Sequence, residues 1–360
     1  MDRAILQDRK YQTEVVNKVV EYLSTSEINS VLIESPVGSG KTIMGLKVVA
    51  ILQQQNPKLT VNWVACRQHI LKQTEIINKQ CFKLHINYVS AFEKNPPRCD
   101  LCVLDEAHHE ATNSCIRLYK KMENSKTLGL SATPQRTDRM KLTFKKIVKS
   151  CSIAKLIEDG FLSPYKSYKL AHYDPITVAN VIGLEPKRFG KTIAFFKTIK
   201  DCSVFKNKLL EYGIACHVVT GSSDKDKQIE DFETGKVQVI ANVSVLTEGF
   251  DVPDLNSVFL KDASKLPCIQ MAGRGLRKSN AKEYCNLIQS SESKFQVENI
   301  ATPIESFRQK GQYWLATHGD TLQIEDELSW YKQRLAFLNE MGFKLRQLRD
   351  HASRAEIINY

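Results

Sequence analysis

Short runs of apolar residues recur along the chain and alternate with longer stretches of helical periodicity. This alternation is typical of βαβ units, in which helices connect parallel strands. We therefore predict an α/β fold with two series of parallel strands. The first series comprises Val31–Glu34, Val61–Ala65, Ile86–Val89, Leu101–Leu104 and Thr127–Leu130. The second series comprises Thr192–Phe196, Ala215–Val219, Val237–Ala241, Ser257–Leu260 and Tyr284–Ile288.

Two other stretches do not follow this pattern. The segment from Pro164 to Gly190 is rich in Pro, Tyr and Lys and has no sustained periodicity, which favours a linker. From about Ser290 the character changes, and Ile304 to Tyr360 shows a mostly helical pattern with one apolar stripe. The predicted organisation is a first lobe at 1–167, a linker at 168–190, a second lobe at 191–292 and a helical C-terminal appendage at 293–360.

The distribution of charge along the chain indicates the kind of partner. The net charge is +11, and residues 1–167 hold 25 basic against 16 acidic side chains. Such an excess favours a polyanionic partner, although a merely soluble basic surface remains an alternative. No apolar run is long enough to cross a bilayer, and the N-terminus has no signal-peptide pattern. We therefore expect an intracellular protein without a membrane partner.

The ten cysteines are scattered along the sequence. Cys99 and Cys102 have C-x-x-C spacing, but no second pair completes the four ligands of a zinc site. Both lie where a buried strand is predicted, so we expect a role in the core. The other cysteines are interpreted as reduced intracellular thiols.

A glycine-rich segment follows the first predicted strand and precedes a helical stretch. Its glycines allow backbone N–H groups to surround phosphate oxygens, and the positive end of the next helix favours the same anion. Lys41 would reach the β- and γ-phosphates of ATP, and Thr42 would bind Mg²⁺. The segment departs from the full phosphate-loop pattern at its first position, where Ser35 replaces Gly. The predicted loop comprises Pro36, Val37, Gly38, Ser39, Gly40, Lys41 and Thr42.

An acidic pair ends the apolar run at Leu101–Leu104. A carboxylate at the carboxyl end of a strand beside a phosphate loop is well placed to hold Mg²⁺, which indicates this role for Asp105. Its neighbour Glu106 could act as the general base that polarises the attacking water. His108 is then a candidate for relaying the state of the nucleotide to the rest of the lobe.

These residues resemble the superfamily 2 DExH-box helicases over about residues 9–288. The resemblance implies two tandem RecA-like lobes that close on ATP. Arg9, Tyr11 and Gln12 look like the adenine-reading Q motif, since a glutamine amide can pair with adenine. Two further segments resemble family motifs: Ala65-Cys-Arg67…Gln73 looks like motif Ia, which touches the nucleic-acid backbone, and Ser131-Ala-Thr133 looks like motif III, which couples the lobes. The nucleic-acid candidates in the first lobe are Arg67, Gln73, Ser90 and Arg136, and the coupling candidates are Ser131, Ala132 and Thr133.

The second lobe carries two more such segments. Thr247-Glu-Gly-Phe-Asp251 looks like motif V, in which Thr247 would contact nucleic acid and Gly249 and Asp251 the nucleotide. The resemblance also implies nucleic-acid contacts at Thr220 and Gly221. The stretch from Gln270 to Arg277 looks like motif VI, whose arginines enter the ATP site from the opposite lobe. A guanidinium neutralises the γ-phosphate only when the cleft is shut. The predicted catalytic residues are Lys41, Asp105, Glu106, Gln270, Arg274 and Arg277.

Three stretches point to one branch of the superfamily, the RadD-like and restriction-subunit-like helicases, which include phage branch-migration motors. They are Asp105–His109, Ala132–Asp138 and Ile157–Pro164. Met271 departs from the pattern, because many relatives have Gln or Arg there. The resemblance implies a monomeric ATP- and Mg²⁺-dependent motor that acts on single-stranded, forked or branched DNA.

Two alternatives remain open, namely an RNA helicase and a nucleic-acid binding module with weak ATPase activity. The basic run from Arg136 to Lys149 could line a DNA path or form a solvated helix face. At the C-terminus, Lys344, Arg346 and Arg349 could contact a duplex arm. The sequence also predicts that truncation after about Ser290 leaves basal ATP hydrolysis intact, because every candidate catalytic residue precedes it.

Overall fold

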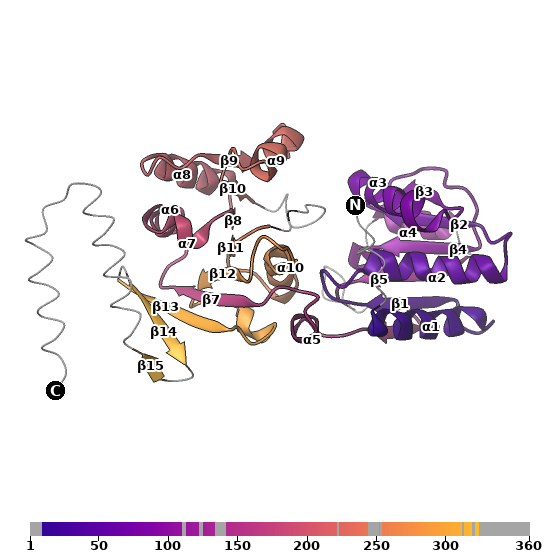
Figure 1. Cartoon of the computed structure of the whole chain (residues 1–360). Helices are drawn as coiled ribbons and strands as arrows, with labels where there is room; N and C mark the ends of the chain where they lie inside the picture. Colours follow the sequence, from indigo (N-terminus) through magenta and orange to yellow (C-terminus); the bar gives the residue numbers. More distant parts are fainter. Residues whose placement is uncertain are drawn as a thin grey trace, which may run out of the picture.

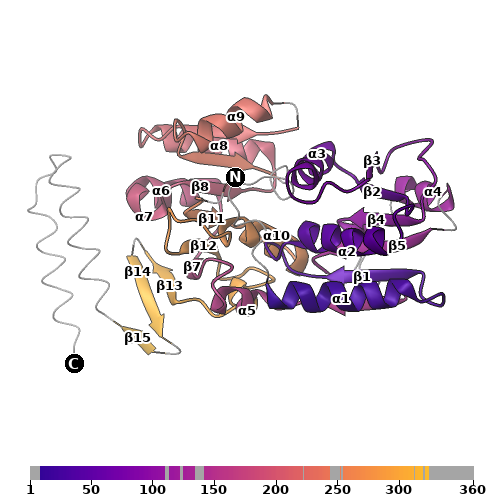
Figure 2. The same ribbon diagram turned by 45° about the vertical axis from the view of Figure 1, so that its right-hand side comes forward.

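The chain folds into two α/β lobes that lie side by side, with helices α5 and α10 at the side of the second lobe that faces the first (Figures 1 and 2). The computed structural model describes residues 9–109, 113–121, 125–133, 142–221, 223–243, 252, 254–311, 313–318 and 321–323. Within these residues, no helix is long and apolar enough to cross a membrane.

The first lobe contains a six-stranded parallel sheet with the order β3-β2-β4-β5-β1-β6. Its five predicted strands are confirmed, and β6 is an additional strand within the basic run. The strands are β1 (Ser30–Glu34), β2 (Val61–Ala65), β3 (Asn87–Ser90), β4 (Leu101–Asp105), β5 (Lys126–Ser131) and β6 (Lys146–Lys149). The helices are α1 (Lys10–Ser24), α2 (Lys41–Gln55), α3 (Gln68–Ile77), α4 (Asn113–Lys121), the π-helix η2 (Asn78–Phe82) and the 3₁₀ turn η3 (Ala107–His109).

The second lobe contains a nine-stranded sheet with the order β15-β14-β13-β7-β12-β11-β8-β10-β9. The five predicted strands of this lobe are confirmed. Its strands are β7 (Tyr165–Leu170), β8 (Thr192–Phe195), β9 (Cys216–Val219), β10 (Val239–Asn242), β11 (Ser257–Phe259), β12 (Cys285–Ser290), β13 (Glu305–Lys310), β14 (Tyr313–His318) and β15 (Thr321–Gln323). Its helices are α5 (Ile153–Glu158), α6 (Pro175–Leu184), α7 (Pro186–Phe189), α8 (Ile199–Leu210), α9 (Lys225–Glu233), α10 (Lys265–Gly275) and the turn η4 (Val297–Asn299).

Local sequence explains where several elements begin. Asp174 caps α6 by accepting hydrogen bonds from the N–H groups of Ile176 and Thr177, and proline occupies the first helical position. Thr198 and Asp201 form a reciprocal capping box at the start of α8. Strand β4 is buried along its whole length, as its apolar sequence requires in a central parallel strand. Cys102 lies in this strand and is buried, which confirms its predicted place in the core.

The prediction of a linker at 168–190 is wrong. Strand β7 pairs in parallel with β12 and β13 inside the second sheet. Tyr165 and Tyr168 are buried, whereas Lys166 and Lys169 point to acidic partners at Glu305 and Glu298. The strand was missed because its alternation of Tyr with Lys lacks a continuous apolar run. Helix α6 then buries its own apolar residues in the core of the same lobe.

The lobe boundary also lies earlier than predicted. Ile153, Leu156 and Leu162 belong to the hydrophobic core of the second lobe, together with Ile193 and Phe195 of β8. The segment that contains α5 therefore packs with the second lobe, although the sequence placed it in the first. Tyr11 is half-buried and packs against the cores of both lobes.

The helical prediction is wrong for the described residues between 305 and 323, which include the strands β13, β14 and β15, paired antiparallel in this order. Gly311 adopts a φ of +62°, which permits the turn between the first two of these strands. Phe307 stacks on Tyr168 with the ring centroids 4.7 Å apart. Trp314 is 3% exposed and donates a hydrogen bond of 2.9 Å to Glu185. The residues beyond 323 lie outside the described part of the chain.

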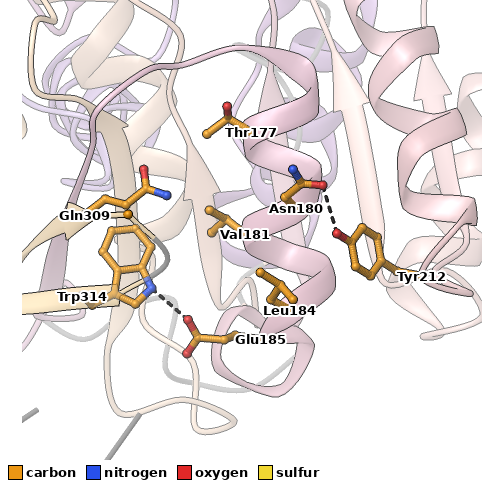
Figure 3. Close-up of a pocket in the computed structure, with 9 residues that line it drawn as sticks. Thr177, Asn180, Val181, Leu184, Glu185, Tyr212, Gln309 and Trp314 are labelled. Atoms are coloured by element: carbon orange, nitrogen blue, oxygen red, sulfur yellow. Dashed lines mark hydrogen bonds between the residues drawn. The ribbon is translucent and has the colours of Figure 1, made fainter. Parts of the chain in front are cut away.

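A pocket of about 390 Å³ lies between the β13–β14 hairpin and helix α6 (Figure 3). Val181 and Leu184 contribute apolar side chains to its lining, and Trp314 and Glu185 meet at one end of it. Asn180 accepts a hydrogen bond from Tyr212 at another side. The hairpin is therefore joined to the helical layer of the second lobe by buried aromatic and polar contacts.

Candidate functional site

The phosphate loop connects strand β1 to helix α2. Gly38 and Gly40 both adopt φ of +81°, a conformation that favours glycine. A Cβ atom on Gly40 would lie 2.6 Å from the side-chain amide nitrogen of Gln12, so a larger residue there would displace this amide. Lys41 begins the 15-residue helix α2, and its ammonium donates to the carbonyl oxygen of Pro36 over 3.4 Å. The loop therefore has the backbone and the helix N-terminus that phosphate binding needs.

A chain of hydrogen-bonded hydroxyl groups supports this loop. Ser35 donates to the hydroxyl of Ser39 over 2.6 Å, and Ser39 donates to the carbonyl oxygen of Pro36 over 2.7 Å. The hydroxyl of Ser150 lies 2.6 Å from that of Ser35. Ser35 therefore replaces the glycine of the family pattern, and its buried hydroxyl is hydrogen-bonded to two other serine hydroxyls. The role of Ser150 was missed, because 115 residues separate it from Ser35.

Asp105 ends the central strand β4 and is 4% exposed. Burial and the nearby charge of Glu106 raise the pKa of Asp105 to about 7, whereas the ammonium of Lys41 acts in the opposite direction. The residues therefore bring a buried carboxylate close to Lys41, which is followed in α2 by the Thr42 hydroxyl. Carboxylate and hydroxyl oxygens suit Mg²⁺, and a bound cation would offset the cost of burying this charge. The donor set thus fits the predicted magnesium ion.

Glu106 follows Asp105 with a φ of +51°, which is unusual for a residue with a side chain. Its N–H group donates to Asp105 over 3.0 Å. One carboxylate oxygen of Glu106 lies 3.3 Å from Nδ1 of His108, which is 2% exposed. The strained backbone turns this carboxylate away from the strand direction and toward the buried imidazole. This arrangement links the candidate base to the candidate relay residue.

The Q-motif residues contact the phosphate loop. Tyr11 donates to the carbonyl oxygen of Ser39 over 2.6 Å, and the Gln12 amide donates to the same oxygen over 2.9 Å. The Arg9 guanidinium lies 4.4 Å from the ring centroid of Phe161. Burial raises the pKa of Tyr11, which keeps its hydroxyl protonated as a donor. Adenine recognition by Gln12 stays a prediction, and the structure adds a link from this residue to the loop.

Helix α10 carries the motif VI residues against the phosphate loop. A Cβ atom on Gly273 would lie 2.8 Å from Val37, so the helix and the loop touch across the two lobes. Gln270 and Arg274 are 8% and 6% exposed in this helix. Arg277 follows it and pairs with Leu162, which in turn packs on Gly38. The contact of Leu162 with the loop was missed, although its segment carried part of the family resemblance.

The candidate coupling residues lie at the carboxyl end of β5. The carbonyl oxygen of Ser131 accepts a hydrogen bond of 2.9 Å from the N–H group of Ser35, at the start of the phosphate loop. The N–H group of Thr133 donates to the Ser131 hydroxyl over 3.3 Å. Ala132 stands between them. The structure therefore joins this segment directly to the nucleotide side of the first lobe.

Most of the described nucleic-acid candidates lie at or just after the carboxyl ends of strands in the two lobes. Arg67 and Ser90 stand at the carboxyl ends of β2 and β3, and Thr220 and Gly221 follow β9. Gln73 lies on α3. Burial lowers the pKa of Lys225 at the start of α9, and the charges of Arg67 and Arg274 lower it further. The sequence did not single out Lys225. Its side chain in the second lobe is close enough to Arg67 of the first lobe for the two charges to interact. Arg136, Thr247, Gly249 and Asp251 lie outside the described residues.

Comparisons with known proteins agree with this geometry. Residues 5–93 match the family described as "Type III restriction enzyme, res subunit", and residues 175–279 match "Helicase conserved C-terminal domain". The chain is 25% identical over 292 residues to a "51.5 kDa protein" of a Lactococcus phage, covering 70% of this chain and 63% of the relative. It is 28% identical over 230 residues to "Putative ATP-dependent helicase IRC3" of Saccharomyces cerevisiae, covering 52% of this chain and 33% of the relative. The chain thus spans about one third to two thirds of these relatives.

Solved structures share the fold. The "ATP-dependent Type ISP restriction-modification enzyme LlaBIII bound to DNA" has a TM-score of 0.63 at 15% identity, covering 91% of this chain and 32% of that one. "S. cerevisiae Dbp5 bound to RNA and ADP BeF3" has a TM-score of 0.56 at 14% identity, covering 84% of this chain and 93% of that one. The chain therefore contains both family domains on a two-lobe RecA-like fold, and it is similar to the superfamily 2 helicases of the restriction-subunit-like branch.

Proposed function

We propose that this chain is a nucleic-acid-dependent ATPase that moves on or remodels DNA, with forked or branched DNA as its preferred substrate. One observation carries the proposal. The helix that bears Arg274 lies against the phosphate loop that precedes Lys41, since Gly273 contacts Val37. An ATP bound at this loop would therefore be enclosed between two lobes. Hydrolysis can then be coupled to movement of one lobe against the other.

The residues of the first lobe divide the chemistry among them. Lys41 binds the β- and γ-phosphates of ATP, and Glu106 holds and polarises the attacking water. Thr42 and Asp105 would hold Mg²⁺, which would neutralise charge that develops on the phosphate oxygens. Tyr11 and Gln12 both donate to the Ser39 carbonyl oxygen. Binding of the adenine base by Gln12 would therefore also affect the shape of the phosphate loop.

The second lobe completes the site. Arg274 and Arg277 stabilise the transition-state charge from across the cleft, and Gln270 orients groups beside them. These contacts form only when α10 rests on the phosphate loop. ATP binding therefore favours the closed arrangement, and loss of the γ-phosphate releases it. One copy of the chain supplies both sides of the cleft, which is consistent with a monomer.

We place the polymer across both lobes, at the carboxyl ends of β2 and β3 and at the loop after β9. Arg67 and Lys225 come from different lobes and repel each other there. A phosphate backbone between the lobes would relieve this repulsion, so a polyanion favours their approach. DNA is the proposed polymer because the restriction-modification enzyme LlaBIII, which has the higher TM-score of the two solved structures, is bound to DNA, and because the relatives include "Type I restriction enzyme EcoAI endonuclease subunit" of Escherichia coli.

The test is the rate of ATP hydrolysis without polymer and with single-stranded DNA, duplex DNA, forked DNA or RNA. We expect stimulation by DNA, with the forked form strongest, and binding that weakens steeply with salt. A rate that no polymer changes would refute the motor function. Stronger stimulation by RNA than by any form of DNA would refute the substrate assignment, and it would favour the RNA helicase alternative.

A further inference from the structure

Phe92 stands out among the apolar side chains of the described residues. Its side chain is 67% exposed, more than any other large apolar side chain there, and it is the only aromatic among them. Single exposed aliphatic residues are common on protein surfaces. With 67% of its side chain in solvent, the ring contributes little to the core, so packing alone does not explain its presence.

The position of this ring is fixed by the parallel sheet. Ser90 ends β3 and pairs with Ala65 at the end of β2, and the N–H group of Ala91 donates to Ala65 over 3.0 Å. Ala91 is buried, so the side chain that follows it turns outward. Arg67 stands two residues after Ala65. Phe92 therefore lies at the same edge of the sheet as Arg67.

The backbone around Phe92 is anchored. Its N–H group donates to the hydroxyl of Ser90 over 3.3 Å, and the N–H group of Glu93 donates to the carbonyl oxygen of Ser90 over 2.9 Å. This turn fixes the backbone from which the ring projects at the sheet edge. This part of the chain therefore does not have to be ordered when the ring binds a flat partner.

We propose that Phe92 is a stacking platform for a base of the bound single strand, beside the phosphate contact of Arg67. This inference rests on the proposed function, because it assigns the polymer to the same edge of the first lobe. Every nucleobase presents a π-face, so an aromatic ring at a phosphate-binding edge binds without regard to sequence. A base inside a duplex keeps its faces covered by its neighbours. Phe92 thus gives the chain a preference for unpaired strands.

The experiment compares Phe92→Ala, Phe92→Trp and the control Ile199→Ala, which removes a 56% exposed side chain from α8 of the other lobe. Affinity is measured for a single-stranded oligonucleotide and for blunt duplex DNA over a series of salt concentrations. We expect Phe92→Ala to weaken single-strand binding by about 5- to 150-fold, the range of one stacking contact. The salt dependence should stay unchanged, because no phosphate contact is lost. Ile199→Ala should bind as the unmodified chain does.

Phe92→Trp keeps an aromatic face, so it should retain affinity, and its added fluorescence should be quenched by single-stranded DNA. Unchanged single-strand affinity in Phe92→Ala, or an equal loss on duplex DNA, would overturn the stacking role. So would an unquenched tryptophan at full occupancy. If the unmodified chain binds no nucleic acid, the proposed function fails and this inference fails with it. If DNA stimulates ATP hydrolysis equally in all variants, only the stacking role fails.

Discussion

Glu106 combines a left-handed backbone conformation with a carboxylate 3.3 Å from a buried histidine, directly after the strand that ends in Asp105. Strained backbone of this kind persists where surrounding contacts hold it, and it is often found at active sites. At the scale of single residues, the site therefore depends on where two neighbouring carboxylates point. Asp105 stays inside the sheet edge, and Glu106 turns out of it.

We predict different effects for substitutions at Lys41 and Glu106. Lys41→Ala should lose most ATP binding, because it removes the charge that meets the phosphates. Glu106→Gln keeps the shape of the side chain but cannot accept a proton. It should bind ATP normally and lower kcat by about 10²- to 10⁴-fold. Equilibrium ATP binding and single-turnover hydrolysis measure the two steps separately. Full turnover in Glu106→Gln would refute its assignment as the base.

Arg274 should act across the cleft. We predict that Arg274→Ala keeps ATP affinity within several-fold and lowers kcat by about 10³-fold, the scale of an arginine finger. The residue is 6% exposed, so thermal unfolding of the variant serves as the folding control. A closed, ATP-bound structure with this guanidinium turned away from the phosphate loop would contradict the prediction.

At the scale of elements, the two lobes contact each other where α10 meets the phosphate loop. Gly273 permits this contact, because a Cβ atom there would lie 2.8 Å from Val37. Gly273→Ala should therefore hold the helix off the loop and misplace Arg274. We predict a fall in kcat of up to about 100-fold with unchanged thermal unfolding, because the contact joins lobes and not one core.

The matched variant is Gly273→Ala combined with Val37→Ala, which removes the methyl groups nearest the added Cβ atom. The pair should recover part of the lost rate when ATP hydrolysis is measured at saturating DNA. A Gly273→Ala variant with normal kcat would show that catalysis does not need this contact.

The β13–β14 hairpin is a structural part of the second lobe. Trp314 is buried against Phe189 and Tyr168 and donates to Glu185. We predict that Trp314→Ala lowers the free energy of unfolding by about 3–5 kcal/mol. Ile304→Ala, at a 51% exposed position just before β13, should change it by less than about 0.5 kcal/mol. Urea denaturation of both variants tests this difference, and equal stability of the two would place the hairpin outside the cooperative unit.

At the scale of the whole molecule, the fold corrects the expected truncation point. Removal of everything after Ser290 would delete β13 and β14, and with them Phe307 and Trp314 of the core. We predict instead that a chain ending at Gln323 keeps its basal rate of ATP hydrolysis, because all candidate catalytic residues and the described core remain.

The same truncated chain tests the basic residues Lys344, Arg346 and Arg349, which lie outside the described residues. We expect its affinity for forked DNA to fall more than its affinity for single strands, at one fixed salt concentration. Equal losses on both substrates, or no loss on either, would remove these residues from fork recognition. A collapse of the basal rate would show instead that the deleted segment supports the fold.

The sequence alone determined the features whose chemistry is local. The phosphate loop, the acidic strand end and ten strands could be predicted, because each is a contiguous pattern of glycine, charge or apolar residues. The motif VI stretch could also be predicted, but its sequence does not indicate that Gly273 contacts Val37 of the phosphate loop.

Only the tertiary structure decided which distant residues come together. Strand β7 alternates Tyr with Lys and became a strand because neighbouring strands cover its tyrosines and acidic residues pair with its lysines. The hairpin at 305–318 replaced a predicted helix because Phe307 and Trp314 gain more from the aromatic core than helical periodicity offers. Contacts such as Gly273 with Val37, or Ser150 with Ser35, join residues more than 100 positions apart. No local pattern encodes them, because they arise from the packing of whole elements and lobes.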